Sequence, residues 1–167
     1  MTTLMGQPID NSFSLPQDER VAVRVDHAAW LAMGRAIFGG FFVWNGIQHF
    51  MQTGFMAGYA ATRGVPFPEV VVLGAGAMIL IGGLSVILGI YPRIGTLLIM
   101  LFLIGVTPVM HNFWNVTDPA ARANDFGHFL KNIGLFGGAC LAMAMPEPWP
   151  GSLRQPHVGR AEIRPAA

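Results

Sequence analysis

The chain has 167 residues, of which 53% are hydrophobic and only 11% are charged. A soluble domain has about 25% charged residues, so this composition excludes an ordinary water-facing surface and predicts an integral membrane protein. The net charge of +1 at pH 7 excludes the basic surface that nucleic-acid binding requires. The single cysteine, Cys140, excludes an internal disulfide framework and an iron–sulfur cluster held by cysteines of this chain.

The first 69 residues predict a tail, a membrane-spanning helix and a loop. Residues 1–27 are polar and predict a cytoplasmic N-terminal tail. Residues 28–50 are apolar except for Arg35, Asn45, Gln48 and His49. Because about 20 apolar residues are enough to cross the hydrocarbon layer, this stretch predicts the first transmembrane helix. Residues 51–69 then predict a loop on the opposite side of the membrane.

The remaining sequence predicts three further spans. Residues 70–91 contain no charge, and residues 94–114 follow after a turn so short that these two helices should form an antiparallel hairpin. After a second loop, residues 126–145 predict the fourth span, and the prolines that follow should end it. Residues 28–146 therefore predict an all-α fold, a transmembrane four-helix up-down bundle. Residues 147–167 predict an exposed, Pro/Arg-rich C-terminal tail.

The basic residues predict the orientation of this bundle. In a four-span topology, six arginines outside the spans lie on the side of the two termini: Arg20, Arg24, Arg93, Arg154, Arg160 and Arg164. The opposite side carries three basic residues, Arg63, Arg122 and Lys131. Because basic residues concentrate on the cytoplasmic side, both termini should be cytoplasmic, in the inner (plasma) membrane.

Small residues repeat along the predicted helices at spacings that allow close packing of helix backbones. One stripe of the first helix holds Ala32, Ala36 and Gly40, and one stripe of the last holds Gly134, Gly138 and Ala142. In the second helix, the pairs Gly76/Gly83 and Gly82/Gly89 repeat at seven residues. We expect these stripes to hold the bundle together.

Polar residues inside predicted spans are costly, so they are candidates for a functional site. Most of them lie where the end of the first helix, the end of the third and the start of the fourth meet in an up-down bundle. The candidates at this outer end are Asn45, His49, His111, Asn112, His128, Lys131 and Asn132. Arg35 stands apart, near the cytoplasmic end. We expect it to be a structural partner of another helix or of the headgroups, or a group that pairs with an anion or a quinone carbonyl.

The residue types at the outer end leave several functions open. Three histidines can bind a metal, although no His-x-x-x-His or Glu-x-x-His spacing supports this. Histidine, lysine and amides can hydrogen-bond a quinone headgroup and exchange protons with it. Lys131 with the histidines can hold an anion. A network that merely ties helix ends and loops together explains the same residues without any ligand. The position of the histidines near the interface argues against a haem.

The sequence from Arg35 to His49 resembles the first helix of the DoxX-like family of small four-helix membrane proteins. The matching positions are Arg35, Gly39, Gly46 and His49, with histidine where the family more often has lysine. The resemblance extends over residues 28–146. It includes Glu69 before the second span, the stretch from His111 to Trp114 and the pair Lys131-Asn132.

The resemblance implies an inner-membrane protein associated with redox enzymes, since the family is named for a subunit associated with thiosulfate:quinone oxidoreductase. We therefore expect a subunit of a membrane redox assembly, with a quinone as its possible ligand, the lipid bilayer as its environment and other membrane or redox subunits as partners. A single cysteine argues against a dithiol relay within the chain. The alternatives are a non-catalytic scaffold of a larger complex and, less favoured by four short helices, a small transporter.

Overall fold

A computed structural model describes residues 17–153 of the chain, and every regular element in this part is helical. The elements are α1 (Gln17–Met51), α2 (Thr53–Thr62), α3 (Pro68–Leu88), α4 (Pro92–Met110), the short 3-10 helix η1 (Phe113–Asn115) and α5 (Pro119–Ala144). The prediction of an all-α fold is confirmed for this part. The outer portions of both predicted tails, residues 1–16 and 154–167, lie outside the described residues.

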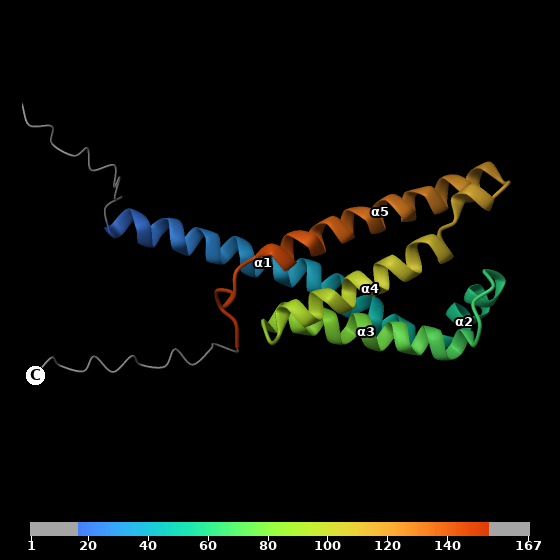
Figure 1. The fold of residues 1–167 in the computed structure, drawn as a ribbon, viewed down its shortest axis with the longest axis horizontal. Coiled ribbons are helices and arrows are strands. Elements are labelled where there is room, and N and C mark those ends of the chain that lie inside the picture. The colour runs from blue at the N-terminus through green and yellow to red at the C-terminus, as the bar shows by residue number, and fades with distance from the viewer. Residues whose placement is uncertain (1–16, 154–167) are drawn as a thin grey trace, which may run out of the picture.

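The four long helices alternate in direction, as Figure 1 shows. α1 and α4 run one way, and α3 and α5 run the other. Within the described residues, two segments are long and apolar enough to cross a membrane, Pro68–Leu88 and Pro92–Asn115. They coincide with the second and third predicted spans. The more polar helices α1 and α5 do not reach the same hydropathy, so the membrane-spanning four-helix bundle stays a prediction.

Prolines and left-handed residues set the ends of the helices. α3, α4 and α5 each begin with a proline, whose missing N–H is no loss in the first turn of a helix. The side chain of Asp118 caps α5 by accepting a hydrogen bond from the Ala121 N–H at 2.7 Å. α3 ends at Gly89, which has a φ of +68°, a conformation that glycine adopts without strain.

α1 and α3 cross in close backbone contact. A Cβ atom placed on Gly83 would lie 2.6 Å from the Gly39 carbonyl oxygen, and one on Gly39 would lie 2.7 Å from the Gly83 oxygen. Two helical turns further along, a Cβ atom placed on Gly46 would lie 3.0 Å from the Gly76 carbonyl oxygen. Two glycines seven residues apart on each helix therefore bring the backbones into contact, as membrane helices require.

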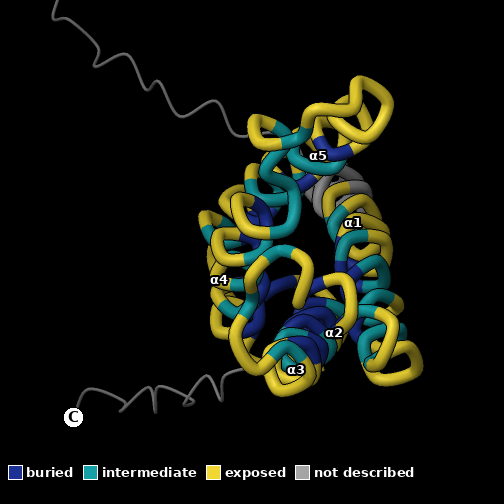
Figure 2. Tube along the Cα trace, turned by 90° about the vertical axis from the view of Figure 1, so that its right-hand side faces the viewer, coloured by how far each residue is buried: buried dark blue, intermediate teal, exposed yellow. Residues whose placement is uncertain are grey.

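The apolar core lies around this crossing. Figure 2 shows buried residues gathered where α3 meets α1 and α4, with exposed residues on the outward sides of the helices. The main cluster consists of Phe42, Ile79, Val86, Ile99, Leu103, Ala142 and Trp149. A second, smaller cluster of Ala57, Ala60 and Val72 joins α2 to α3.

Three details differ from the sequence-based expectations. Residues 51–69 were expected to form a loop but contain α2, because Ala57 and Ala60 give this short helix a small apolar face that packs on Val72. α1 begins at Gln17, within the predicted tail, and α5 begins seven residues before residue 126. The segment after α5 is not an exposed tail as far as Leu153, because Trp149 and Ser152 are buried.

The small-residue stripes were only partly right. Gly76 and Gly83 lie in the helix crossing as expected, but on α1 their partners are Gly39 and Gly46 instead of Ala32, Ala36 and Gly40. Gly40 and Gly134 face open space, and Gly138 meets only the ring of Phe38, at 3.3 Å. Seven-residue spacing predicted the contact on α3, whereas four-residue spacing selected the wrong face of α1.

The glycine crossing can be tested by adding one methyl group. We expect Gly83→Ala to lower the stability of the protein by about 1–3 kcal/mol, because the new Cβ must displace the backbone of α1. Gly40→Ala is the matched control, since its Cβ meets nothing within 4 Å. Thermal unfolding followed by circular dichroism in detergent measures both, and equal midpoints for the two variants would contradict the crossing.

Candidate functional site

A cavity of about 580 Å³ opens between the helices at the end of the molecule where α2 lies. Its walls are mostly apolar, and all five α-helices contribute to them. Its polar wall residues include five of the eight predicted site residues: Asn45, His49, His111, Lys131 and Asn132. The topology therefore brings residues from the end of α1, the end of α4 and the middle of α5 to one space.

The α1 residues of this cavity are held by their own helix. The Asn45 amide donates to the Phe41 carbonyl at 2.7 Å, and Nδ1 of His49 lies 2.7 Å from the Asn45 carbonyl oxygen. Since a carbonyl only accepts, Nδ1 carries the proton, and Nε2 of a neutral His49 is left as an acceptor. The Cβ of His49 also packs against Gly76, so the helix crossing fixes the height of this ring in the cavity.

The α5 residues of the cavity have unused hydrogen-bonding capacity. Asn132 is only 6% exposed, and its side chain makes no hydrogen bond to any described side chain or backbone group. The ammonium group of the exposed Lys131 lies 5.6 Å from the centre of the Phe41 ring and has no ion pair within residues 27–153. Buried amides normally have partners, so Asn132 points to a ligand with acceptor oxygens, and Lys131 can add a charged donor beside it.

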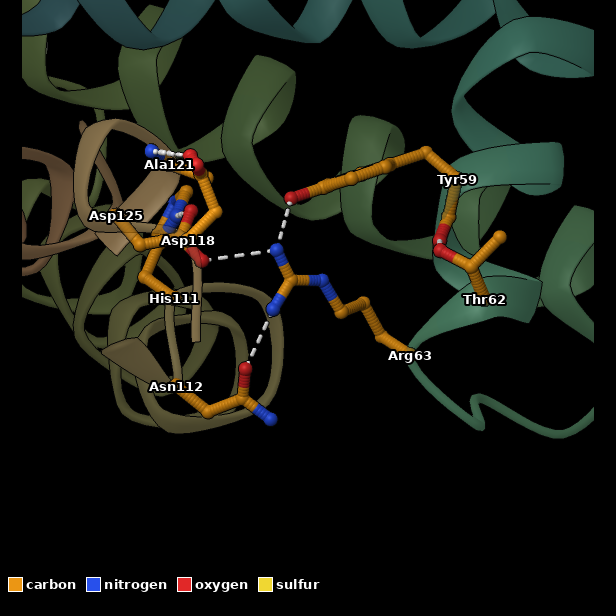
Figure 3. A network of polar contacts seen from close by, with 8 residues as sticks. All are labelled: Tyr59, Thr62, Arg63, His111, Asn112, Asp118, Ala121 and Asp125. Atoms are coloured by element: carbon orange, nitrogen blue, oxygen red, sulfur yellow. Dashed lines mark hydrogen bonds and ion pairs between the residues drawn. The ribbon is translucent and has the colours of Figure 1, made fainter. Parts of the chain in front are cut away.

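A second polar cluster closes the loop side of the cavity (Figure 3). Arg63, which follows α2, pairs with Asp125 of α5 at 2.8 Å and donates to the Tyr59 hydroxyl at 2.6 Å. Its other terminal nitrogen donates to the side-chain oxygen of Asn112. Burial alone would lower the pKa of Arg63, but the hydrogen bonds to Asp125 and Tyr59 outweigh this, so its pKa is raised.

The two remaining predicted histidines lie beside this cluster. The rings of His111 and His128 stack with their centres 5.0 Å apart and an angle of 17° between their planes. Nδ1 of His111 is 3.7 Å from a carboxylate oxygen of Asp125, too far for a hydrogen bond. Only His111 reaches the cavity wall. The arrangement therefore places two imidazole rings and one carboxylate side by side at the loop end of the cavity.

Three predicted site residues, His128, Asn112 and Arg35, do not line the cavity. Asn112 is engaged by Arg63 in the loop cluster. Arg35 lies at the opposite end of α3, where it donates to the carbonyls of Val86 at 3.0 Å, Ile87 at 2.6 Å and Pro150 at 2.8 Å. Arg35 thus ties α1 to the end of α3 and to the segment after α5.

The sequence analysis missed the roles of Arg63 and Tyr59. Arg63 was counted only as a loop charge, because its partners Asn112 and Asp125 are 49 and 62 residues away and no spacing connects them. For metal binding, the described residues contain no group of three or more His, Cys, Asp or Glu side chains that could hold an ion.

Comparison with known proteins agrees with the helical membrane architecture. The family model described as DoxX matches residues 30–112. Inner membrane protein YphA of Escherichia coli (strain K12) is 28% identical over 90 residues, which cover 54% of this chain. The chain spans 63% of the length of that relative. No solved structure matches the chain. The family match includes Asn45, His49 and His111 but ends before α5, which supplies Lys131 and Asn132.

The ion pair of the loop cluster should be important for stability. We expect Arg63→Met to destabilise the protein by about 2–5 kcal/mol, because it leaves the buried carboxylate of Asp125 without its partner. The double variant Arg63→Met/Asp125→Leu should recover much of this loss.

Arg122→Met is the matched control, because Arg122 is an exposed cation on α5 that forms no ion pair within residues 27–153. Its unfolding midpoint in detergent should stay close to that of the unsubstituted protein. Equal losses for Arg63→Met and Arg122→Met would show that the cluster contributes nothing specific.

Proposed function

The chain belongs to the DoxX family of membrane proteins, and we propose that it is an inner-membrane subunit of a redox assembly whose cavity holds a quinone headgroup. The observation that carries the proposal is the buried Asn132 side chain, which has no hydrogen bond to the described residues and lies beside Lys131 in the wall of an otherwise mainly apolar cavity. Electron-transfer partners supply the rest of the assembly.

The proposal includes four membrane crossings with both termini in the cytoplasm. α1 and α5 expose large apolar side chains as α3 and α4 do: Ile37 and Trp44 on α1, and Ile133 and Leu141 on α5, are each at least half exposed. Such surfaces are stable against lipid but not against water. The excess of arginine on the side of the termini favours a cytoplasmic location for both, which puts the cavity near the outer face.

The orientation can be tested with reporters fused to the C-terminus. A fluorescent protein fused there should fluoresce, and alkaline phosphatase fused there should be inactive, because the phosphatase folds only outside the cytoplasm. Fusions within the segment between α2 and α3 should give the reverse pattern. An active phosphatase at the C-terminus would contradict the proposed topology.

The chemistry of the cavity is that of a quinone site. Its volume of about 580 Å³ lies within the range of small-molecule sites. A quinone ring would contact the apolar wall, and its two carbonyl oxygens need donors, which Lys131 and Asn132 can provide. When the ring carries hydroxyls, in the quinol, Nε2 of His49 is placed to accept from one of them.

Conversion of quinone to quinol requires two electrons and two protons. The described residues of this chain contain no redox-active pair of thiols, so a partner subunit with its own redox cofactor would supply the electrons. His111, the one of the two stacked histidines that reaches the cavity wall, is the group placed to exchange a proton with a bound quinone. In this scheme the chain binds the quinone and exchanges protons with it, while the partner subunit supplies the electrons.

The second candidate function is a non-catalytic scaffold. The observation that favours it is that Arg63 and Arg35 are both bound to several groups of distant segments and act as ties between helices. A scaffold explains these ties, but it gives no reason for the unpartnered Asn132 amide in the cavity wall. Quinone binding therefore separates the two candidates.

Binding of a short-chain quinone to the purified protein tests the proposal. We expect Asn132→Leu to weaken binding about tenfold or more, since a lost hydrogen bond in a closed site costs about 1–3 kcal/mol. Lys131→Met should have a comparable effect. Asn124→Leu, an exposed position on the same helix, is the control and should bind as the unsubstituted protein does. Binding is measured by quenching of tryptophan fluorescence.

Two results would contradict the quinone proposal. One is an affinity that is the same in Asn132→Leu, Asn124→Leu and the unsubstituted protein. The other is a failure of the unsubstituted protein to bind either the oxidised or the reduced quinone. With correct folding in all variants, either result would leave the scaffold as the better candidate.

A further inference from the structure

The opposite end of α3 carries a second, smaller pocket that the proposed function does not use. The segment after α5 turns back toward the α3–α4 turn (Figure 1), and the Leu153 N–H donates to the Leu88 carbonyl at 3.0 Å. This segment and the turn enclose a pocket of about 250 Å³. Gly89, Glu147, Trp149 and Ser152 are among the residues that line it.

Two buried donors in the wall of this pocket have no acceptor. Trp149 is 2% exposed and Ser152 is 7% exposed. The indole N–H of Trp149 and the hydroxyl of Ser152 make no hydrogen bond to any residue that the structure describes. A buried donor without a partner costs about 1–3 kcal/mol, so a ligand that accepts from both would be stabilised here.

A buried positive charge lies directly beside these donors. Arg35 is 5% exposed, and its partners among the described residues are three backbone carbonyls and the Trp149 ring, 5.5 Å away, with no carboxylate. The guanidinium has five N–H groups, of which these bonds use three. Two N–H groups and a full positive charge are thus left without an anionic partner.

Gly89 lies next to both the Arg35 guanidinium and the Ser152 hydroxyl. A Cβ atom at this position would collide with Ser152 Oγ and would lie 2.8 Å from Nη2 of Arg35. The lack of a side chain at Gly89 therefore lets both groups approach one side of the α3 terminus. α4 starts at Pro92, which also lines the pocket, and the positive end of its helix dipole adds to the field there.

The one acidic residue of the pocket wall is partly neutralised. The Glu147 carboxylate lies 3.4 Å from Nε of Arg93, and its side chain is 38% exposed. Glu147 is therefore paired with Arg93 at the rim of the pocket. Its carboxylate forms no ion pair with the buried guanidinium of Arg35, which bonds to backbone carbonyls. The local balance favours an anion.

We propose that this pocket binds the phosphate group of an anionic ligand, with Arg35, Trp149 and Ser152 as its donors. Two sources share this chemistry, the headgroup of an anionic phospholipid and free inorganic phosphate. The surroundings include the exposed apolar side chains of Ile94 and Leu153, which suit a pocket at a membrane surface. The site is separate from the quinone cavity and does not depend on it.

The full-length protein, purified and stripped of lipid in a neutral detergent, provides the test. Its thermal unfolding is measured with increasing inorganic phosphate, and again in vesicles of phosphatidylcholine with and without phosphatidylglycerol. We expect a rise of the unfolding midpoint with phosphate groups from at least one source. A rise with both means that the site accepts either, whereas a rise only with phosphatidylglycerol or only with inorganic phosphate identifies the source.

Two variants connect the effect to the pocket. Ser152→Ala and Trp149→Phe each remove one donor and keep the packing, and each should weaken the phosphate-dependent shift, with an apparent affinity about tenfold lower. Thr62→Val and Trp44→Phe are the controls, because neither residue lines the pocket or bonds to a residue that does, and both should keep the full response. Ser152→Ala alone is decisive if Trp149→Phe does not fold.

The proposal is overturned if neither phosphate nor phosphatidylglycerol changes the midpoint of the unsubstituted protein. It is also overturned if Ser152→Ala responds as strongly as Thr62→Val. Failure here leaves the quinone proposal untouched, because the two pockets lie at opposite ends of α3.

Discussion

The contact of α1 with α3 through glycine determines how the rest of the chain can be arranged. Gly39 and Gly83 bring two backbones so close that a single methyl group would overlap a carbonyl oxygen. Lipid supplies no hydrophobic force between helices, so this close approach provides the attraction that holds them. It also fixes His49 against Gly76 at one end and Arg35 beside Gly89 at the other. Both polar sites thus depend on the same crossing.

The two ends of the molecule use their polar residues in different ways. In the loop cluster, Arg63 has a carboxylate, a phenol and an amide as partners, and its charge is fully compensated. In the large cavity and in the smaller pocket, by contrast, Asn132 and Ser152 are buried residues whose side chains have no hydrogen bond to the described residues. Satisfied groups stabilise the fold, whereas unsatisfied ones cost free energy that only a ligand would recover. This difference distinguishes structural ties from candidate binding groups.

The sequence predicts the helices well because the apolar runs of α3 and α4 are long, uncharged and bounded by proline and glycine. Topology then places Asn45, His49 and Lys131 around one space, since alternating helices bring these positions to the same end. Spacing could not reveal that Arg63 joins α5, or that Trp149 returns to cover the end of α3, because both contacts link segments far apart in the chain. Those contacts depend on side-chain packing that the sequence pattern does not encode.

The central claim is that Asn132 faces a cavity that a quinone fills, and cysteine labelling tests it most directly. In a Cys140→Ala background, Asn132→Cys should react with a small maleimide, and a fully substituted short-chain benzoquinone should slow this reaction in a concentration-dependent way. Ile133→Cys, at an exposed neighbouring position outside the cavity wall, should react at a rate that the quinone does not change. Equal quinone effects at the two positions, or none at Asn132→Cys, would contradict the account.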